Sequence, residues 1–194
     1  MTHFVGRFVT LRAIERPDLV ALARFHNDPV VAAGLEFAWP LSMASQERFF
    51  ERVDQDERSK RLVVEVPDHG VIGYTGLWGI DWINRRALNG VVIGRPDLQG
   101  HGYGTDTLMT IARVAFEELG LHRLDAEISA FNEASLRLYL GKCGWHEEGR
   151  RREHFYRRGR YWDTVLVGIL AAEYQEHAKT TAYWPASHVL ARVK

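Results

Sequence analysis

The hydrophobic period of the chain changes once, and a glycine-rich loop stands where it changes. Residues 61–94 alternate apolar with small or polar residues and contain a Pro-Asp-His-Gly turn, which predicts a meander of antiparallel strands. From Leu108 to Leu119 the apolar residues recur at helical spacing, and Gly120 ends the pattern. The segment Gln99–Thr105, between the two, has a glycine at every second position. A meander followed by a crossover helix predicts a mixed sheet of the α/β class.

The remaining segments extend this plan to a single domain over residues 1–194. We expect a sheet of about seven strands flanked by four or more helices. The core is expected over about 4–170, and residues 171–194 are expected to form a helical extension and a tail. The further predicted elements are a first strand over 4–14, helices beginning at Pro17 and near Ser42, a strand over 124–130, a helix from Asn132 to Gly144, and closing strands over 145–152 and 161–170.

Composition excludes several classes of protein. The 25 lysines and arginines balance the 25 aspartates and glutamates, so no global field favours a nucleic acid or an anionic membrane, and we expect neither as a partner. The single cysteine, Cys143, precludes an intramolecular disulfide, and the cytoplasm is the expected compartment. No apolar run is long enough to span a bilayer, and the first residues lack the pattern of a signal peptide.

The glycine loop has the chemistry of an anion site. Glycines let backbone N–H groups approach a phosphate closely, and the start of the next helix adds unpaired donors. A plain turn has the same composition, so composition alone leaves both interpretations open. Gly104 is followed by Thr105 without a lysine, which excludes a P-loop. The dinucleotide fingerprint needs a different glycine spacing, although Asp125 lies near the position of its ribose-binding acid and keeps that alternative open.

Two segments resemble the signatures of one enzyme family. Gln99-x-x-Gly102-x-Gly104 is similar to the pyrophosphate-binding signature of the GNAT acetyltransferases, in the same context of strand, loop and helix. The stretch Asn132–Trp145 resembles the family's second signature, a helix with Asn-x-x-Ser-x-Arg-x-Tyr that ends in a glycine and an aromatic residue. The resemblance covers about residues 4–170. Asn27-Asp28-Pro29 and Ile72-Gly73 look most like the branch that includes ribosomal-protein N-terminal acetyltransferases.

The resemblance implies a GNAT-like mixed sheet, acetyl-CoA as the donor, no metal, and direct attack by a primary amine in a ternary complex. The amine would belong to a small molecule or to a peptide N-terminus. The resemblance places the cofactor against backbone groups of a strand and of the glycine loop, with two side chains from the second signature. The residues implied are Val91, Val92, Ile93, Gln99, Gly100, His101, Gly102, Tyr103, Gly104, Thr105, Asn132 and Arg137.

The resemblance also suggests catalytic residues. Tyr139 stands where many members of the family place a tyrosine that protonates the leaving thiolate, and Ser135 is the competing candidate. A tyrosine on the apolar face of a helix can equally be core packing. The general base is undetermined among Glu36, Asp81 and Asp163, each of which could equally be a surface acid.

The acceptor is not identified by the sequence. Phe37, Trp39, Trp78 and Trp82 fall in regions that build the acceptor side of the family's fold, although ordinary packing explains them as well. Six arginines between residues 150 and 160 could hold an acidic acceptor, the 3′-phosphate of CoA or RNA, but a solvated hairpin is the simpler explanation. The alternatives to an acetyltransferase are an inactive acyl-CoA-binding protein and a GNAT with another acyl donor. A homodimer is left open.

Overall fold

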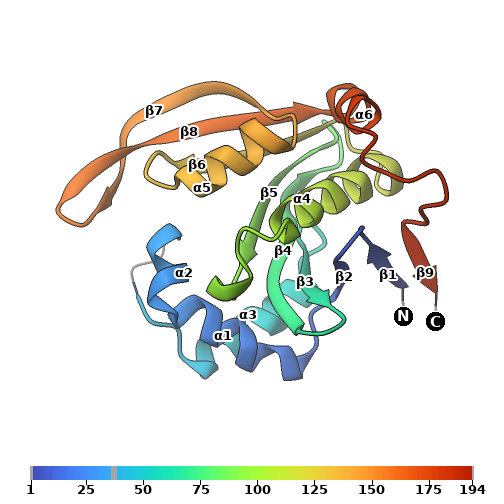
Figure 1. Cartoon of the computed structure of the whole chain (residues 1–194). Helices are drawn as coiled ribbons and strands as arrows, with labels where there is room; N and C mark the ends of the chain where they lie inside the picture. Colours follow the sequence, from blue (N-terminus) through green and yellow to red (C-terminus); the bar gives the residue numbers. More distant parts are fainter. Residues whose placement is uncertain (1, 36–38, 194) are drawn as a thin grey trace.

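The computed structural model describes residues 2–35 and 39–193. Within them, nine strands form a single sheet (Figure 1). The expected mixed α/β sheet is confirmed, with more strands than expected. The strand order is β7-β8-β6-β5-β4-β3-β2-β1-β9. The bounds are β1 Thr2–Val5, β2 Thr10–Ala13, β3 Lys60–Val66, β4 Gly70–Asp81, β5 Arg86–Ile93, β6 Arg123–Ser129, β7 His146–Arg157, β8 Arg160–Leu170 and β9 Ala191–Val193.

Helices cover both faces of the sheet. Val63 and Val64 are neighbours on β3 and therefore point to opposite faces. Val63 packs with Leu19 and Leu22, whereas Val64 packs in the larger cluster with Leu108 and its neighbours. The helices are α1 Leu19–Asn27, α2 Pro29–Gly34, α3 Met43–Gln55, α4 Tyr103–Arg113, α5 Glu133–Leu136 and α6 Ala171–Thr180. Among the described residues, no helix is long and apolar enough to cross a membrane.

The sheet opens into a wedge between β5 and β6. These two strands are parallel and pair only at Arg86 with Arg123, Ala87 with Leu124 and Leu88 with Asp125. Beyond Leu88 each strand continues without pairing to the other, so their carboxyl ends diverge (Figure 1). At the end of β5, the backbone groups that face β6 therefore lack a strand partner and can bind a molecule that enters the wedge.

The N-terminal strand expected over residues 4–14 is instead a hairpin of β1 and β2. The turn between them is held by the carboxylate of Asp106 on α4, which accepts hydrogen bonds from the backbone N–H groups of Arg7, Phe8 and Val9 at 2.6–2.9 Å. A Cβ on Gly6 would lie 2.5 Å from this carboxylate, so the turn requires a glycine there. The prediction missed the turn because its partner lies about a hundred residues away in the sequence.

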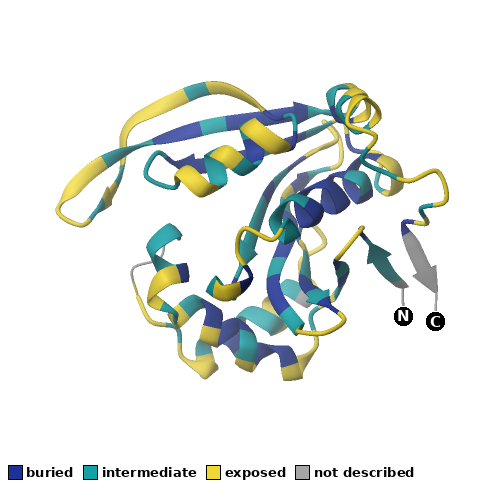
Figure 2. Ribbon diagram, viewed as in Figure 1, coloured by how far each residue is buried: buried dark blue, intermediate teal, exposed yellow. Residues whose placement is uncertain are grey.

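Two helices end in a wider π-helical turn. Helix α4 continues through Val114–Glu118, and α5 continues through Arg137–Lys142 and ends before Gly144, whose φ is 73°. Such turns are rare and often lie at functional sites. After residue 170, where a helical extension and a tail were expected, the chain forms α6, and the tail adds β9 beside β1. Figure 2 shows that burial is concentrated in α4 and the middle strands, while β7 is largely exposed.

Candidate active site

A cavity of about 590 Å³ lies at the open end of the wedge. The end of β5, the glycine loop, the start of α4, the α5 segment and α2 all contribute to its wall. Most of the sequence-predicted cofactor residues meet here, although His101 and Tyr103 do not line it. The lining residues are Val30, Val31, Gly34, Leu35, Val91, Val92, Ile93, Leu98, Gln99, Gly100, Gly102, Gly104, Thr105, Asn132, Ala134, Ser135, Arg137, Leu138 and Lys142.

The glycine loop presents the start of α4 to this cavity. Gly100 and Gly102 have φ values of 83° and 89°, a region that other residues rarely adopt. Gly102 is the residue before the helix, so the N–H groups of the first turn have no partner within the helix. The side chain of Gln99 donates to the carbonyl of Ile93 at 3.1 Å and ties the loop to the end of β5. The arrangement suits a pyrophosphate, because an anion gains both from the N–H groups and from the helix dipole.

Asn132 connects two walls of the cavity. Its Oδ1 accepts a hydrogen bond from the N–H of Ser135 at 3.1 Å and caps α5, while its Nδ2 donates to the carbonyl of Gly34 at 2.9 Å. Ser135 itself lines the cavity. The guanidinium of Arg137 pairs with Glu133 at 3.1 Å on the exposed side of the same helix. Asn132 is therefore held by two backbone partners before any ligand binds.

Tyr139 is buried, with 3% of its surface exposed, and is not among the described residues that line the cavity. The hydroxyl donates to Oδ1 of Asn89 on β5 at 3.1 Å, and Nδ2 of Asn89 donates to the carbonyl of Gly76 at 2.9 Å. Desolvation, with a smaller contribution from Cys143, raises the pKa of Tyr139 above its ordinary value. Asn89 was missed by sequence reasoning. The available signal was a lone amide inside an otherwise apolar strand, where a buried polar side chain needs a partner.

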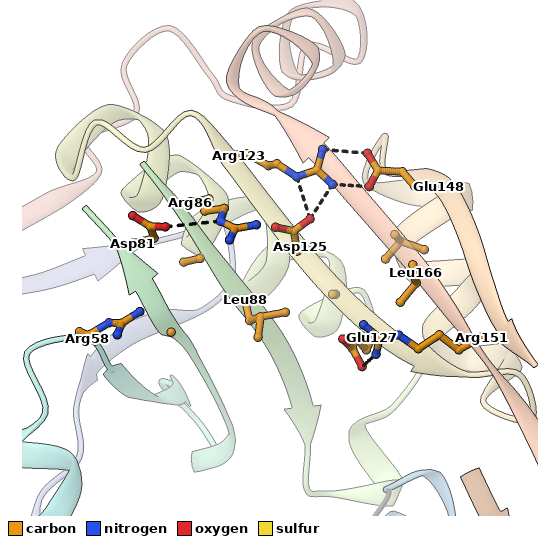
Figure 3. A pocket seen from close by; sticks show the side chains of 14 residues that line it. Arg58, Asp81, Arg86, Leu88, Arg123, Asp125, Glu127, Glu148, Arg151 and Leu166 are labelled. Carbon is orange, nitrogen blue, oxygen red and sulfur yellow. Dashed lines mark hydrogen bonds and ion pairs between the residues drawn. The ribbon is translucent and has the colours of Figure 1, made fainter. Parts of the chain in front are cut away.

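Asp81 and Asp163, two of the three candidate bases, do not line this cavity. Glu36 lies outside the described residues, and no Asp or Glu is among the described residues that line the cavity. Asp81 lines a separate cavity of about 480 Å³ on the sheet face, at the paired end of β5 and β6 (Figure 3). Its carboxylate accepts hydrogen bonds from the side chain and backbone of Asn84 and from the N–H of Ile83. Asp163 accepts the N–H of Glu153 at 3.0 Å.

The wall formed by α2 was not anticipated from the sequence. Its last carbonyls are bound by Arg157 of β7, whose guanidinium donates to Leu35 and, at 2.7 Å, to Ala32. Together with the bond from Asn132 to Gly34, these contacts hold the end of α2 across the cavity from α5. No local pattern indicates contacts between residues more than ninety positions apart.

The tryptophans and arginines singled out from the sequence have different environments. Phe37 lies outside the described residues, whereas Trp39 and Trp82 are 82% and 48% exposed. Trp78 is partly buried on the α1 face of the sheet and stacks under the guanidinium of Arg61. In the arginine-rich hairpin, Arg150 pairs with Glu147, Arg151 pairs with Glu127, and Arg160 stacks on Trp162.

A parallel strand pair that splays beside a glycine loop is the arrangement expected from the resemblance to the GNAT acetyltransferases, and comparison with known proteins agrees. The model of the acetyltransferase (GNAT) domain matches residues 9–146. Spermidine N(1)-acetyltransferase of Vibrio cholerae is 30% identical over 86% of this chain and 95% of its own. The uncharacterized N-acetyltransferase YoaA of Bacillus subtilis is 33% identical over 82% of this chain and 92% of its own. The crystal structure of the Vibrio cholerae spermidine enzyme with CoA and spermine superposes with a TM-score of 0.80 at 29% identity, covering 86% of this chain and 98% of that one.

The chain belongs to the GNAT acetyltransferases. It is an N-acetyltransferase that uses acetyl-CoA to acetylate a primary amine. The GNAT-like fold expected from the two signatures is confirmed, and the dinucleotide-binding alternative is wrong. The relatives are a spermidine enzyme and bacterial N-acetyltransferases and do not single out the ribosomal-protein branch.

Proposed function

We propose that the wedge cavity holds the pantetheine arm of acetyl-CoA along Val91–Ile93 and its pyrophosphate on the glycine loop. The lining of the cavity supports this assignment, because both sets of residues face the same space of about 590 Å³. In this arrangement a backbone N–H at the end of β5 polarises the thioester carbonyl, and the amine attacks it directly in a ternary complex. Asn132 contacts the same arm while capping α5.

We propose that Tyr139 protonates the thiolate that leaves. Its hydroxyl is oriented by Asn89 on β5, the strand that borders the wedge, and burial keeps the phenol protonated. The Tyr139→Phe variant should lower kcat about 100-fold, the lower end of what general acid catalysis contributes, with little change in the affinity for acetyl-CoA. A Ser135→Ala variant is the matched comparison, because Ser135 lines the cavity but has no comparable anchor. A large loss for Ser135→Ala and none for Tyr139→Phe would reverse the assignment.

The pKa of Tyr139 gives a pH prediction. A phenol acts as an acid only below its pKa, and desolvation raises this pKa above the usual value of about 10. Ionisation of Tyr139 should therefore cause no fall in kcat as the pH rises from about 8 to about 10. A pH profile of kcat for the wild type and Tyr139→Phe tests this. A descending limb in that range that disappears in the variant would contradict it.

For the acceptor we propose a small-molecule primary amine. The support is the similarity to spermidine N(1)-acetyltransferase over 86% of the chain. Release of CoA from acetyl-CoA, measured as free thiol against a panel of amines and peptides, tests the proposal. Turnover of peptides alone would favour the N-terminal acetyltransferase branch instead. The choice of the general base among Glu36, Asp81 and Asp163 stays open. The domain limits of 1–194, the cytoplasmic location and a homodimer stay predictions.

A further inference from the structure

Two glycines face each other across β4 and β5 in the part of the sheet beside the wedge. Gly76 pairs with Gly90, which immediately precedes Val91. A Cβ on Gly90 would lie 2.7 Å from the ring of Trp78, and one on Gly76 would lie 2.8 Å from Cδ of Arg61. The two side chains therefore occupy the space that the glycines leave. They stack, with the guanidinium carbon 4.2 Å from the ring centroid of Trp78.

This stack lies on the face of the sheet that α1 covers, opposite the face covered by α4. Residues 74, 76 and 78 alternate onto one face of β4, and Tyr74 of this set packs against the cluster of α1. His26 of α1 stacks on Tyr74 with ring centroids 5.1 Å apart. The face therefore presents aromatic rings and one guanidinium beside the strand that leads to Val91.

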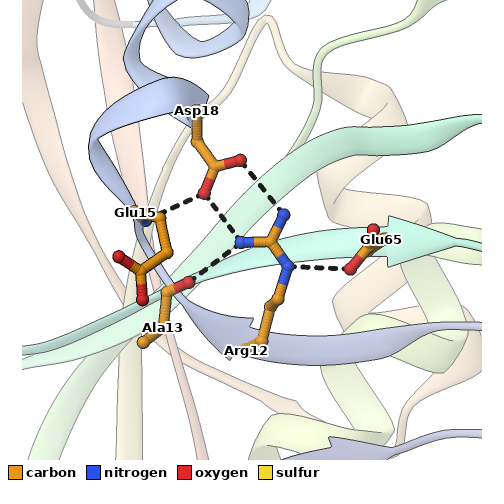
Figure 4. A network of polar contacts seen from close by, with 5 residues as sticks. All are labelled: Arg12, Ala13, Glu15, Asp18 and Glu65. Atoms are coloured by element: carbon orange, nitrogen blue, oxygen red, sulfur yellow. Dashed lines mark hydrogen bonds and ion pairs between the residues drawn. The ribbon is translucent and has the colours of Figure 1, made fainter. Parts of the chain in front are cut away.

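Among the described residues, no carboxylate pairs with Arg61, in contrast to Arg12 and Arg123 on other strands. Arg12 on β2 is bound by Asp18 and by Glu65, each at 2.7 Å (Figure 4). Arg123 on β6 is bound by Asp125 and Glu148. Among the described residues, no acidic oxygen lies within 4 Å of the Arg61 guanidinium, and Nε donates only to the hydroxyl of Ser59 at 3.2 Å.

The surroundings of the two arginines on β2 and β3 affect their ionisation in opposite directions. The hydrogen bond to Asp18, with further support from Glu65, raises the pKa of Arg12. Desolvation lowers the pKa of Arg61, and the weaker influences of Tyr74 and Asp56 do not offset it. A partly buried cation without a counter-ion is costly for the folded protein, and an anion that binds to it removes that cost.

We propose that Arg61 binds a carboxylate of the acceptor, so that the substrate is an amine that also carries an acidic group. Arg61, Gly76 and Gly90 lie in register on three adjacent strands. Strands are about 4.8 Å apart, so the backbone of Arg61 lies about 10 Å from Gly90. Its guanidinium lies over the ring of Trp78, and that ring closely approaches Gly90. A guanidinium binds a carboxylate through two parallel hydrogen bonds. This inference rests on the proposed function and narrows its acceptor.

The test uses pairs of amines that differ only in the second end group. Glycine, β-alanine, 4-aminobutyrate and 5-aminopentanoate are compared with the diamines of equal chain length, together with dipeptides and their amides. Spermidine is included. For each, kcat/KM is measured by release of CoA with the wild type, Arg61→Gln and Arg61→Lys. Arg58→Gln is the control, because Arg58 donates to the carbonyl of Ile80 and lines the separate cavity of about 480 Å³ described above.

The wild type should prefer the acid in at least one matched pair by 10-fold or more. Arg61→Gln should remove this preference mainly through KM, Arg61→Lys should restore part of it, and Arg58→Gln should keep it. A wild type that prefers every diamine, or a preference that survives Arg61→Gln, would overturn the assignment of Arg61 while the acetyltransferase proposal stands. Failure to bind acetyl-CoA, measured separately by calorimetry, would instead count against the proposed cofactor cavity.

Discussion

Helices α4 and α2 border the same cavity but are held in place by different means. Helix α4 is anchored through the carboxylate of Asp106, which is fully buried and accepts four hydrogen bonds. Three come from the backbone of the β1–β2 turn, and the fourth comes from the hydroxyl of Tyr183 at 2.9 Å. The helix that presents the glycine loop is thus joined to both ends of the chain.

The six-residue helix α2 has its carboxyl end held by side chains from other elements. Arg157 donates to the carbonyls of Ala32 and Leu35, and Asn132 donates to that of Gly34. A Cβ on Gly34 would lie 3.4 Å from Nδ2 of Asn132, an ordinary contact distance, so the two walls meet closely at this point. The cofactor side of the cavity is therefore built into the core, whereas the facing wall depends on a few polar contacts across the cleft.

The largest effect is expected on the α4 side, from Asp106→Asn. The variant keeps the size of the side chain but turns one acceptor into a donor that faces donors, which leaves buried N–H groups without partners. Each unsatisfied group costs about 1–3 kcal/mol, so the free energy of unfolding should fall by about 3 kcal/mol. Chemical denaturation of the wild type and the variant measures this difference in the free energy of unfolding. Asp97→Asn is the control, because Asp97 is an exposed partner of Arg95 and should change little. Equal losses in both variants would mean that the Asp106 anchor is not special.

A second prediction separates strain in the glycine loop from its role in binding. Gly102 and Gly120 both have positive φ, at 89° and 65°, and neither has an atom within 4 Å of its missing Cβ. An alanine should therefore cost about 1–2 kcal/mol of stability at either position. Only Gly102→Ala should also weaken the binding of acetyl-CoA, by about 10-fold, because only that loop faces the cavity. Calorimetric titration with acetyl-CoA measures the affinity of both variants. An equal loss of affinity in the two would show that backbone strain alone weakens the binding.

The third prediction concerns the α2 wall. Arg157→Gln removes the guanidinium that binds two carbonyls, and hydrogen bonds from charged groups contribute about 1.5–3 kcal/mol each. We expect KM for the amine to rise about 10-fold while the affinity for acetyl-CoA changes less than 3-fold. Arg158→Gln, on the neighbouring exposed residue of the hairpin, should leave both unchanged. If Arg157→Gln weakened acetyl-CoA binding by the same factor as it raised KM for the amine, the α2 wall would contribute to both binding sites, and the comparison between the two walls would fail.

The same difference explains what the sequence could predict. The glycine loop and the helix from Asn132 are contiguous segments whose residue types are dictated by local backbone geometry and by close approach to a phosphate. The positions of the central strands along the sequence follow from periodicity for the same reason. Such features can be read from a few neighbouring residues, and they locate the cavity.

Features that depend on distant partners could not be predicted. The pairing of Tyr139 with Asn89 joins residues fifty positions apart, and Arg157 reaches α2 from more than a hundred positions away. In the sequence, Arg157 is one of six arginines that a solvated hairpin would explain. Composition does not show which of them binds the carbonyls at the end of α2. The π-helical turn at Arg137–Lys142 likewise follows from packing, since no residue type requires it.

The smallest effect is expected for Asp81, which was a candidate base. The side-chain hydrogen bond from Asn84, aided by backbone N–H groups, lowers the pKa of Asp81 below its ordinary value. The carboxylate is therefore ionised throughout the neutral range, and it stabilises the β4–β5 turn rather than facing the acyl-donor cavity. Asp81→Asn should leave kcat/KM and its pH profile unchanged, because a group with a lowered pKa cannot produce an acidic limb near neutral pH. An acidic limb that disappears in this variant would instead place proton transfer on the Asp81 side of the sheet.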